Sequence, residues 1–303
     1  MGVGFGYPFV QLLYGVRIYS YTHYPIVSED MIQTVASKEV QFNNSKSISQ
    51  SPLKMAVKQH YYRLLIQFYK ICGIFADEVA ANSSWTRKHM DSLWDKGDRI
   101  KTIYPPCDTS EFINNISLTK PRENMMISFA QFRPEKDHML QLEIWKRVLS
   151  NANCPPDAHF TMIGTCRGED DRKIVENLKV KAEELGIRDR LSFELNVSRD
   201  ELFAIFQRAK VAIHTMKAEH FGISVVELMS SGIITIAHNS AGPKMDIIGA
   251  SPKVVGYLGD TAESYSFFVL SGLLKYNDSF HTDLKNDARK WVKDQFGMEA
   301  FSD

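Results

Sequence analysis

The sequence lacks several features that would place it in a protein class at once. Its 36 basic side chains are balanced by 36 acidic ones, so there is no electrostatic case for a nucleic-acid partner. No apolar run reaches the length of a membrane span, so the chain is expected to have no transmembrane segment of its own. Its four cysteines, Cys72, Cys107, Cys154 and Cys166, have no paired spacing. They indicate neither a disulfide framework nor a zinc site, and a reducing compartment fits best.

Catalytic signatures of fixed spacing are missing as well. The chain has no H-E-x-x-H motif and no visible Ser-His-Asp or Cys-His arrangement. The acidic pair Asp170 and Asp171 stands where a helix should begin, and acids are favourable there without any ligand. No metal site is therefore expected.

What the chain does contain is a regular alternation of short β-branched runs with amphipathic helical stretches. This order predicts an α/β fold with parallel sheets and right-handed crossovers. The expected strands are 17–23, 78–82, 100–105, 125–131, 160–165, 190–195, 211–216, 234–239 and 254–259. The expected helices are 53–75, 85–95, 138–150, 169–186, 199–208, 224–231, 261–275 and 282–295.

A polar segment, 106–124, carries proline toward both ends and interrupts this alternation. It predicts a linker between two domains, which are 1–118 (including the linker) and 119–303. The second domain has enough elements for a complete doubly wound sheet, whereas the two or three strands before the linker are too few for one. The apolar start, 1–15, is short and broken by glycine and proline, and is expected to be a core segment.

The helix expected at 53–75 allows two interpretations. Its aromatic residues lie on one side, and its basic residues, Lys54, Lys58, Arg63 and Lys70, lie elsewhere. Packing of the aromatic side against the sheet is the favoured interpretation. A basic, aromatic helix can also lie on a membrane surface, and that alternative stays open.

The stretch AEHFGISVVELMSSG, 218–232, places two acids around a turn and a helix start. Ser224 and Glu227 have the spacing of a capping box, in which each side chain bonds the backbone amide of the other residue. This structural role accounts for Ser224 and Glu227, but it does not account for Glu219. Nor does it explain why Gly222 stands against the helix start.

A ligand would use the same geometry. The first amides of a helix and its partial positive charge bind phosphates, and Gly222 permits close approach to the backbone. Carboxylates at Glu219 and Glu227 can accept hydrogen bonds from sugar or ribose hydroxyls, so the stretch suits a nucleotide-sugar diphosphate. On this interpretation Glu219→Gln reduces donor affinity or transfer with little change in melting temperature, whereas Glu227→Gln affects both.

Glu219 and Glu227 form an E-x7-E pattern. Together with the residues between the two acids, this pattern resembles the signature of retaining glycosyltransferases of the GT-B class. Further stretches narrow the resemblance, and they occur in the order YTHYPIVSEDM (21–31), ANSSWTRKH (81–89), AQFRPEKDH (130–138), MIGTCRGEDD (162–171), HTMKAEHFGISVVELMSSG (214–232) and AHNSAGPKMDII (237–248). Over nearly its whole length the chain is similar to the GDP-mannose-dependent α-1,2-mannosyltransferases of the dolichol pathway. The resemblance implies a GT-B-like fold of two Rossmann-like domains facing a cleft. It also implies that the N-terminal domain is incomplete and that the chain is truncated at both ends.

The resemblance assigns roles to charged residues. Arg133 and Lys136 would neutralise the donor diphosphate as it leaves, although solvated loop charges look the same in sequence. The spacing between them is shorter than in the broader glycosyltransferase pattern. His23 would face the donor sugar across the cleft, where the alternative is a structural histidine at a strand end.

The implied site has three parts. The catalytic residues are His23, Arg133, Lys136 and Glu219. The donor-binding residues are Gly164, Phe221, Gly222, Ile223, Ser224, Glu227 and Gly242; for Gly164 and Gly242 the alternative is turn geometry alone. The acceptor-side residues are Ser83, Ser84 and Trp85, which could instead form only a serine-capped turn.

The implied reaction transfers mannose with retention of configuration, without a metal or another cofactor. The implied partners are GDP-mannose, a dolichyl-diphosphate oligosaccharide, the membrane surface and other mannosyltransferases of lipid-linked oligosaccharide assembly. The implied location is the cytoplasmic face of the endoplasmic reticulum. Two alternatives stay open: a catalytically impaired nucleotide-sugar-binding or scaffold protein of the same pathway, and another nucleotide-sugar enzyme on the same architecture.

Overall fold

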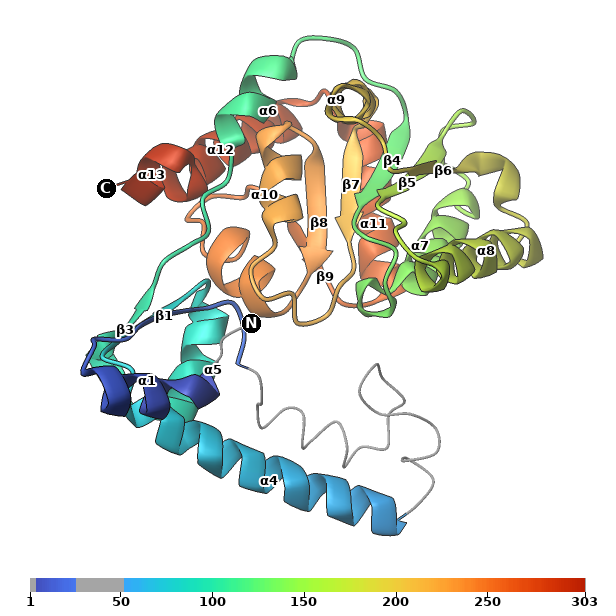
Figure 1. Ribbon diagram of the computed structural model, residues 1–303. Coiled ribbons are helices and arrows are strands. Elements are labelled where there is room, and N and C mark those ends of the chain that lie inside the picture. Colours follow the sequence, from blue (N-terminus) through green and yellow to red (C-terminus); the bar gives the residue numbers. More distant parts are fainter. Residues whose placement is uncertain (1–3, 26–51, 303) are drawn as a thin grey trace. The chain divides into compact units, whose positions relative to one another are not determined.

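The structure is a computed structural model that describes residues 4–25 and 52–302. The chain forms two compact units, Met1–Tyr104 and Pro105–Asp303 (Figure 1). In both units parallel strands alternate with helices, which confirms the predicted α/β class. Residues 26–31 of the YTHYPIVSEDM stretch lie outside the described residues.

The N-terminal unit is built on a three-stranded parallel sheet in the order β1-β2-β3. In its register Tyr19 lies opposite Glu78, and Val79 lies opposite Ile100. Its strands are β1 (Tyr19–Thr22), β2 (Glu78–Ala81) and β3 (Ile100–Thr102). Its helices are α1 (Tyr7–Tyr14), α4 (Pro52–Ile74) and α5 (Ser84–Trp94), with 3-10 turns at Gly4–Gly6 and Gly97–Arg99.

The core of the N-terminal unit forms around Trp94, the last residue of α5. Its indole Nε1 donates to the backbone oxygen of Tyr69 at 3.1 Å, and the two ring centroids lie 5.1 Å apart. Gly73 lies against the indole, where a Cβ would come within 2.3 Å of the ring. Glycine at this position therefore lets α4 and α5 pack closely.

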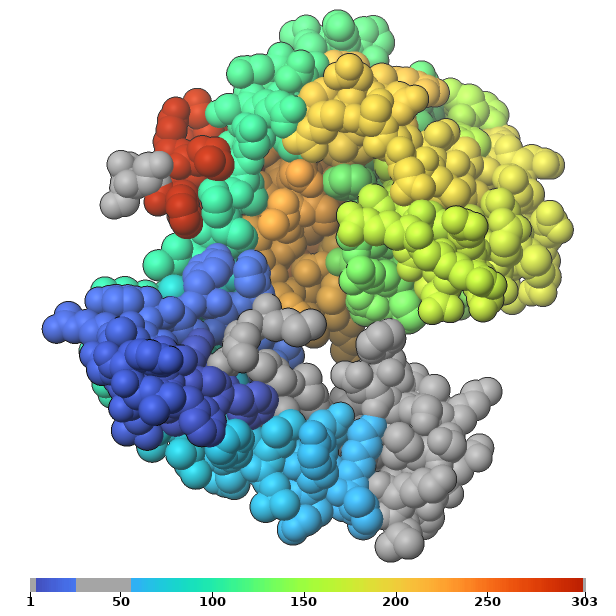
Figure 2. All heavy atoms as spheres, in the orientation of Figure 1, coloured from blue at the N-terminus to red at the C-terminus, as the bar shows by residue number. Residues whose placement is uncertain are grey.

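Many apolar side chains of this unit face solvent. Helix α1 has no buried residue, and Leu12 and Leu13 are 75% and 72% exposed. The prediction that 1–15 forms a core segment is therefore wrong for α1, because YPFVQLLY is apolar almost all round and the sheet cannot cover every side. Helix α4 buries Ile66, Tyr69 and Cys72 on one side. It exposes a second set of apolar residues, Val57, Tyr61, Leu64, Phe68, Ile71 and Ile74. Blue atoms of α1 and α4 are visible on the surface in Figure 2.

None of the helices in the described part of the chain combines the length and the apolar character that crossing a membrane requires.

The C-terminal unit contains a six-stranded parallel sheet in the order β6-β5-β4-β7-β8-β9. Strand order reverses between β4 and β7, and ligands of open α/β sheets bind outside the carboxyl ends of the strands at such a point. The strands are β4 (Met125–Phe129), β5 (His159–Gly164), β6 (Leu191–Leu195), β7 (Val211–His214), β8 (Ile234–His238) and β9 (Tyr257–Gly259).

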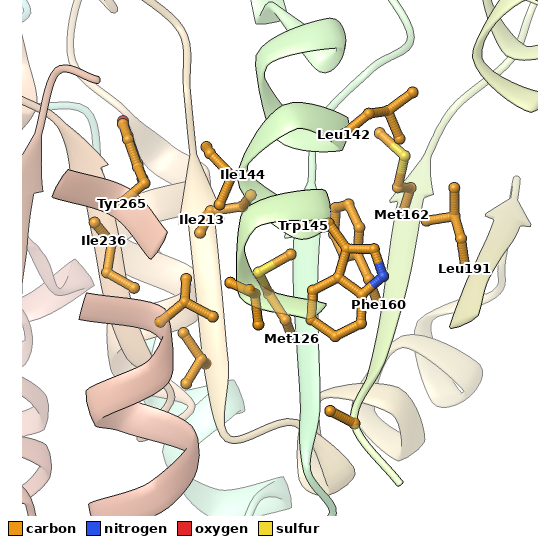
Figure 3. Close-up of a cluster of buried hydrophobic side chains, with 14 of the residues drawn as sticks. Met126, Leu142, Ile144, Trp145, Phe160, Met162, Leu191, Ile213, Ile236 and Tyr265 are labelled. Carbon is orange, nitrogen blue, oxygen red and sulfur yellow. The ribbon is translucent and has the colours of Figure 1, made fainter. Parts of the chain in front are cut away.

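Helices cover both faces of this sheet, because successive side chains of a strand point to opposite faces. Met126 of β4 packs in one cluster with α7, α8 and α11, whereas Met125 and Ile127 pack in another with α6, α9 and α10. In the first cluster Trp145 lies against Phe160 with ring centroids 5.9 Å apart (Figure 3). The helices are α6 (Thr109–Asn115), α7 (His138–Leu149), α8 (Glu169–Glu184), α9 (Arg199–Arg208), α10 (Ile223–Ser230), α11 (Ala262–Lys275), α12 (Ser279–Phe296) and α13 (Met298–Ser302). Single turns lie at Pro134–Lys136, Arg188–Arg190 and Pro243–Ile247, the last a π-helix.

The predicted linker needs correction. Every expected strand and helix occurs, but 106–124 also contains α6, whose Asp108 cap accepts from the Glu111 amide at 3.1 Å. Phe112 and Ile116 are fully buried in the core with α9 and α10. The segment therefore belongs to the C-terminal unit, and the division falls between Tyr104 and Pro105 rather than after residue 118. Most residues around Phe112 and Ile116 are polar, so the sequence pattern does not predict this helix.

Candidate active site

Two loops meet where the strand order reverses. The loop after β4 carries Arg133 and Lys136, and the loop after β7 carries Glu219 before α10 begins. Because β4 and β7 are parallel neighbours, their carboxyl ends lie at the same edge of the sheet. In Figure 1 the arrowhead of β8 marks this edge, at the lower side of the C-terminal unit in that view.

Glu219 stands at the centre of the site. Its Oε2 accepts hydrogen bonds from Lys136 Nζ at 2.6 Å and from His214 Nε2 at 3.0 Å. The side chains of Lys136, Glu219 and His214 are 18%, 14% and 2% exposed. Burial by itself would raise the pKa of Glu219, but the bonds from His214 and Lys136 outweigh it and hold that pKa well below its usual range. Glu219 is therefore a carboxylate at neutral pH, and its Oε1 is engaged by neither of these two partners.

Neighbouring side chains fix the backbone of Lys136. The Thr215 hydroxyl donates to the Lys136 backbone oxygen at 2.8 Å, and Gln141 Nε2 donates to that hydroxyl at 2.9 Å. Asp137, in the left-handed region at φ 50°, caps α7 through its bond from the Leu140 amide. The ammonium group of Lys136 is thus held at the end of a rigid turn.

His138 follows this turn and is buried. Burial, and then the positive charge of Lys136, lower the pKa of His138 to about 4. Its ring stacks on Phe132 with centroids 5.0 Å apart. His138 is therefore a neutral packing residue at physiological pH.

The start of α10 differs from the predicted capping box. The helix begins at Ile223, and its N-cap is Gly222 at φ 115°, which has no side chain that could cap it. The prediction that Ser224 caps the helix with Glu227 is therefore wrong, because the left-handed Gly222 starts the helix before Ser224. The amides of Ile223 and Ser224 belong to the first turn, which has no intrahelical acceptors for them. The Phe221 side chain is buried, 2% exposed, against Phe296.

The AHNSAGPKMDII loop holds the Glu219 loop in place. The Gly242 amide donates to the Glu219 backbone oxygen at 3.0 Å, and a Cβ on Gly242 would lie 2.2 Å from the Phe221 oxygen. Ser240 Oγ accepts from the Ala218 amide at 3.0 Å. Pro243 is the first residue of the turn that follows. Turn geometry and close packing therefore explain Gly242, whose role toward a donor stays a prediction.

Glu227 lies in a different environment from Glu219. Its Oε1 is 3.8 Å from Arg199 Nη1, and Arg199 is itself paired with Glu111 and lies over the Phe112 ring. Burial raises the pKa of Glu227 to about 7, because the attraction of Arg199 only partly offsets it. The two acids of the motif are therefore perturbed in opposite directions.

Arg133 and Gly164 flank the site. The Arg133 side chain is exposed at the start of its turn. A Cβ on Gly164 would lie 2.0 Å from the Ala130 backbone oxygen, so glycine is needed for the β4 loop to cross the end of β5. This supports backbone geometry as the reason for Gly164, and its contact with a nucleotide stays a prediction.

Two of the motifs come together within the N-terminal unit. His23 is exposed at the end of β1, and its backbone oxygen accepts from the Thr86 hydroxyl at 3.0 Å. Ser83 caps α5 by accepting from the Thr86 amide at 3.1 Å, as the turn interpretation predicts. Trp85, next to Ser84 in the first turn, stacks on Tyr24 with centroids 5.2 Å apart. Donor and acceptor roles for these residues stay predictions.

Sequence reasoning missed two residues of the site. His214 ends β7 as an ordinary strand residue, and Arg199 opens α9 as an ordinary helix residue. His214 opens the stretch 214–232 that carries the resemblance, but no spacing assigns it a role, and Arg199 stands in no recognisable spacing. The fold is needed to place both at the site. Across 4–25 and 52–302, no group of three or more His, Cys, Asp or Glu side chains is placed to hold a metal ion.

Family comparison places this site in a known context. Residues 109–291, more than half of the chain, match the model described as "Glycosyl transferases group 1". The chain belongs to this glycosyltransferase family. Residues 1–94 of this glycosyltransferase match a second model, described as "ALG11 mannosyltransferase N-terminus".

Relatives of this glycosyltransferase cover nearly all of it. A human protein named GDP-Man:Man(3)GlcNAc(2)-PP-Dol alpha-1,2-mannosyltransferase is 38% identical over 99% of the chain and 62% of its own length. A Dictyostelium discoideum protein of the same name is 37% identical over 100% of the chain and 60% of its own length. The chain thus spans about three fifths of these relatives, and the predicted resemblance is confirmed.

Solved structures confirm the predicted GT-B fold class. The crystal structure of a glycosyltransferase from Rickettsia africae superposes with a TM-score of 0.67 at 12% identity, covering 99% of this chain and 90% of that one. At such low identity the likeness concerns the fold alone.

Proposed function

We propose that this glycosyltransferase transfers mannose from GDP-mannose, in α-1,2 linkage and with retention, to a dolichyl-diphosphate-linked oligosaccharide. The observation that supports it most is the buried contact of Lys136 and His214 with one oxygen of Glu219, beside the start of α10. A phosphate-binding helix start and an ionised carboxylate suit the two ends of a sugar diphosphate. The substrates come from the names of the relatives.

In the proposed reaction the bond between mannose C1 and the diphosphate oxygen breaks, and a bond from C1 to the acceptor hydroxyl oxygen forms on the same face. The hydroxyl proton passes to the leaving diphosphate, so GDP is released. Lys136, Arg133 and the first amides of α10 stabilise the charge that develops on the diphosphate. In other transferases a metal ion stabilises this charge. Here the cations and amides are proposed to stabilise it, so the proposal needs no metal or other cofactor.

The two acids act as binders in this proposal. Glu219 offers its Oε1 to hydroxyls of the donor mannose, and Glu227 accepts from the ribose. Neither acts as a nucleophile, because a carboxylate pair in that role would have to stand about 5 Å apart around the sugar. Glu219 is instead engaged with Lys136, and Glu227 with Arg199.

The acceptor is a lipid, so we place the reaction at a membrane surface, the cytoplasmic face of the endoplasmic reticulum. The exposed apolar residues of α1 and α4, with Lys58, Arg63 and Lys70 on α4, are the surface proposed to meet it. Other mannosyltransferases of lipid-linked oligosaccharide assembly are proposed as partners there.

The proposal is tested with radiolabelled GDP-mannose and a lipid-linked trimannosyl chitobiose acceptor. Transfer of label to the lipid, in a product that an α-1,2-mannosidase cleaves, is the expected result. Donor binding without transfer would replace the proposal with a nucleotide-sugar-binding protein of the same pathway. No binding of GDP-mannose at all would reject both.

A further inference from the structure

We propose that His214 is a positioning residue of the donor site: its Nε2–H anchors the Glu219 carboxylate, which in turn holds the Lys136 ammonium group. This inference rests on the proposed function and deepens it. His214 does not touch the substrate in this account. It sets the geometry of the two groups that do.

The position of His214 is fixed by the sheet and by a helix packed on it. It is the last residue of β7, paired in register with Ala237 of β8, and its side chain is 2% exposed. The buried Tyr265 hydroxyl, from α11 on one face of the sheet, donates to the His214 backbone oxygen at 2.9 Å. A buried ring on a central strand cannot follow a moving loop, so its Nε2 is a fixed point for the carboxylate.

Glu219 itself lies on a loop and needs such an anchor. Its backbone oxygen accepts from the Gly242 amide, and within the described part of the chain its side chain is held where Lys136 and His214 share Oε2, at 2.6 and 3.0 Å. Lys136 is a charge on a flexible four-carbon stem, so it cannot define the orientation of the carboxylate by itself. The hydrogen bond from His214 fixes the orientation of the Glu219 carboxylate together with Lys136. It leaves Oε1 of Glu219 for a hydroxyl of the donor.

The same bond confines Lys136. With Oε2 fixed by His214, the ammonium group stays at the end of the Pro134–Lys136 turn, where the proposed diphosphate leaves. Without His214, Lys136 and Glu219 would still attract each other but could move together. A preorganised cation stabilises developing charge without reorganising during the reaction, and that advantage would be lost.

Three substitutions of His214 separate positioning from packing. His214→Gln keeps an N–H donor close to the place of Nε2. His214→Asn places its amide near the position of Nδ1, which is too short to reach Glu219, and His214→Leu removes the donor. We expect His214→Leu and His214→Asn to lower kcat/KM for mannose transfer on the order of 10- to 100-fold, as for a lost hydrogen bond to a charged group. His214→Gln retains most of the activity.

His281 provides a matched control. It is equally buried, 2% exposed, and bonds Asp278 through Nδ1 and Tyr257 through Nε2, away from the donor site. His281→Leu should lower the melting temperature about as much as His214→Leu but leave kcat/KM unchanged. Equal losses of activity in the Gln and Leu variants of His214, or in His214→Leu and His281→Leu, would overturn the proposal.

A second measurement does not depend on catalysis. Unfolding free energies of His214→Leu, Glu219→Gln and the double variant form a cycle, which should be non-additive because the two side chains are in contact. If the wild-type protein fails to bind GDP-mannose, the proposed function is rejected, while the cycle still decides whether His214 holds Glu219. An additive cycle overturns the anchoring itself, even in a protein that transfers mannose.

Discussion

At the scale of residues, the two acids of the E-x7-E pattern have separate tasks. Glu219 is a buried carboxylate paired with the Lys136 ammonium group and hydrogen-bonded by His214, whereas Glu227 is a buried acid whose pKa burial raises to about 7. Because only Glu219 is compensated by close partners, removing its charge disturbs the fold more. The structure therefore reverses the expectation from sequence that Glu227 is the acid important for stability.

Glu219→Gln should lower both stability and transfer. Glutamine leaves the Lys136 ammonium group buried without its counter-charge. Breaking a buried ion pair by removing one partner costs about 3–5 kcal/mol, an upper bound here because the amide can still accept one bond. Denaturant unfolding and titration with GDP-mannose measure the two effects. Unchanged unfolding together with unchanged donor affinity would contradict the assigned contacts.

Glu227→Gln should change how stability depends on pH. The folded-state pKa of Glu227, about 7, lies above its ordinary value, so the folded protein binds more protons than the unfolded chain between about pH 4.5 and 7. Glu227 therefore makes the fold less stable as pH rises through that window. The variant should lose this decline and be at least as stable as the wild type at pH 8.

Unfolding free energies at pH 5 and pH 8, for the wild type and Glu227→Gln, provide the measurement. The same substitution at Glu201, an exposed acid of the α9 cap, serves as the control for a carboxyl whose pKa is lowered instead. If the unfolding free energy falls equally between pH 5 and pH 8 in the wild type and in Glu227→Gln, Glu227 is not the cause of the decrease.

At the scale of elements, the alternation of apolar runs was enough to predict the sheets. Strands such as Val211–His214 are short, fully buried runs, and pattern alone identifies them. The sequence does not reveal helix α6, because Phe112 within it and Ile116 just after it are too few buried apolar residues to show a helical period. The cap of α10 was misassigned because the φ of Gly222 depends on the loop packed against it.

The contact of Lys136 with Glu219 could not be derived from residues alone. It requires the order in which β4 and β7 lie side by side, and that order is a property of the whole sheet. The resemblance to known transferases named both residues, but it did not name the bond between them or the part that His214 plays in it. The local sequence pattern thus predicts the strands and helices, whereas the contacts within the site depend on the order of the strands in the sheet.

Gly242→Ala tests how the loops are joined. A Cβ there would lie 2.2 Å from the Phe221 oxygen, so the loop carrying Glu219 must move. We expect kcat/KM for transfer to fall more steeply than stability, because displacement of about 1 Å near a reacting group can cost 100-fold. Gly168→Ala, in a loop with nothing within 4 Å of the added Cβ, is the matched control. Equal activity of the two variants would show that the packing of Gly242 is not needed for the site.

At the scale of the whole molecule, the two units differ in how they use apolar residues. Among the described residues, apolar side chains of the C-terminal unit are buried in clusters on both faces of its sheet. In the described part of the N-terminal unit a smaller cluster forms, and many apolar residues of α1 and α4 stay exposed. Exposed apolar surface of this extent normally marks an interaction site. Because the proposed acceptor is a lipid, we propose that this surface contacts a membrane.

Exposed leucines of α1 permit a test of membrane contact that spares the fold. The double variant Leu12→Ser, Leu13→Ser changes side chains that are already 75% and 72% exposed, so its unfolding free energy should match the wild type. Each leucine that enters the membrane contributes about 1.5–3 kcal/mol when fully buried. The variant should therefore bind vesicles of mixed neutral and anionic lipid at least about tenfold more weakly in a sedimentation assay. Phe267→Ser, at a site 69% exposed on α11 of the other unit, should bind as the wild type does. If all three proteins sediment alike, α1 is not the surface that meets the lipid.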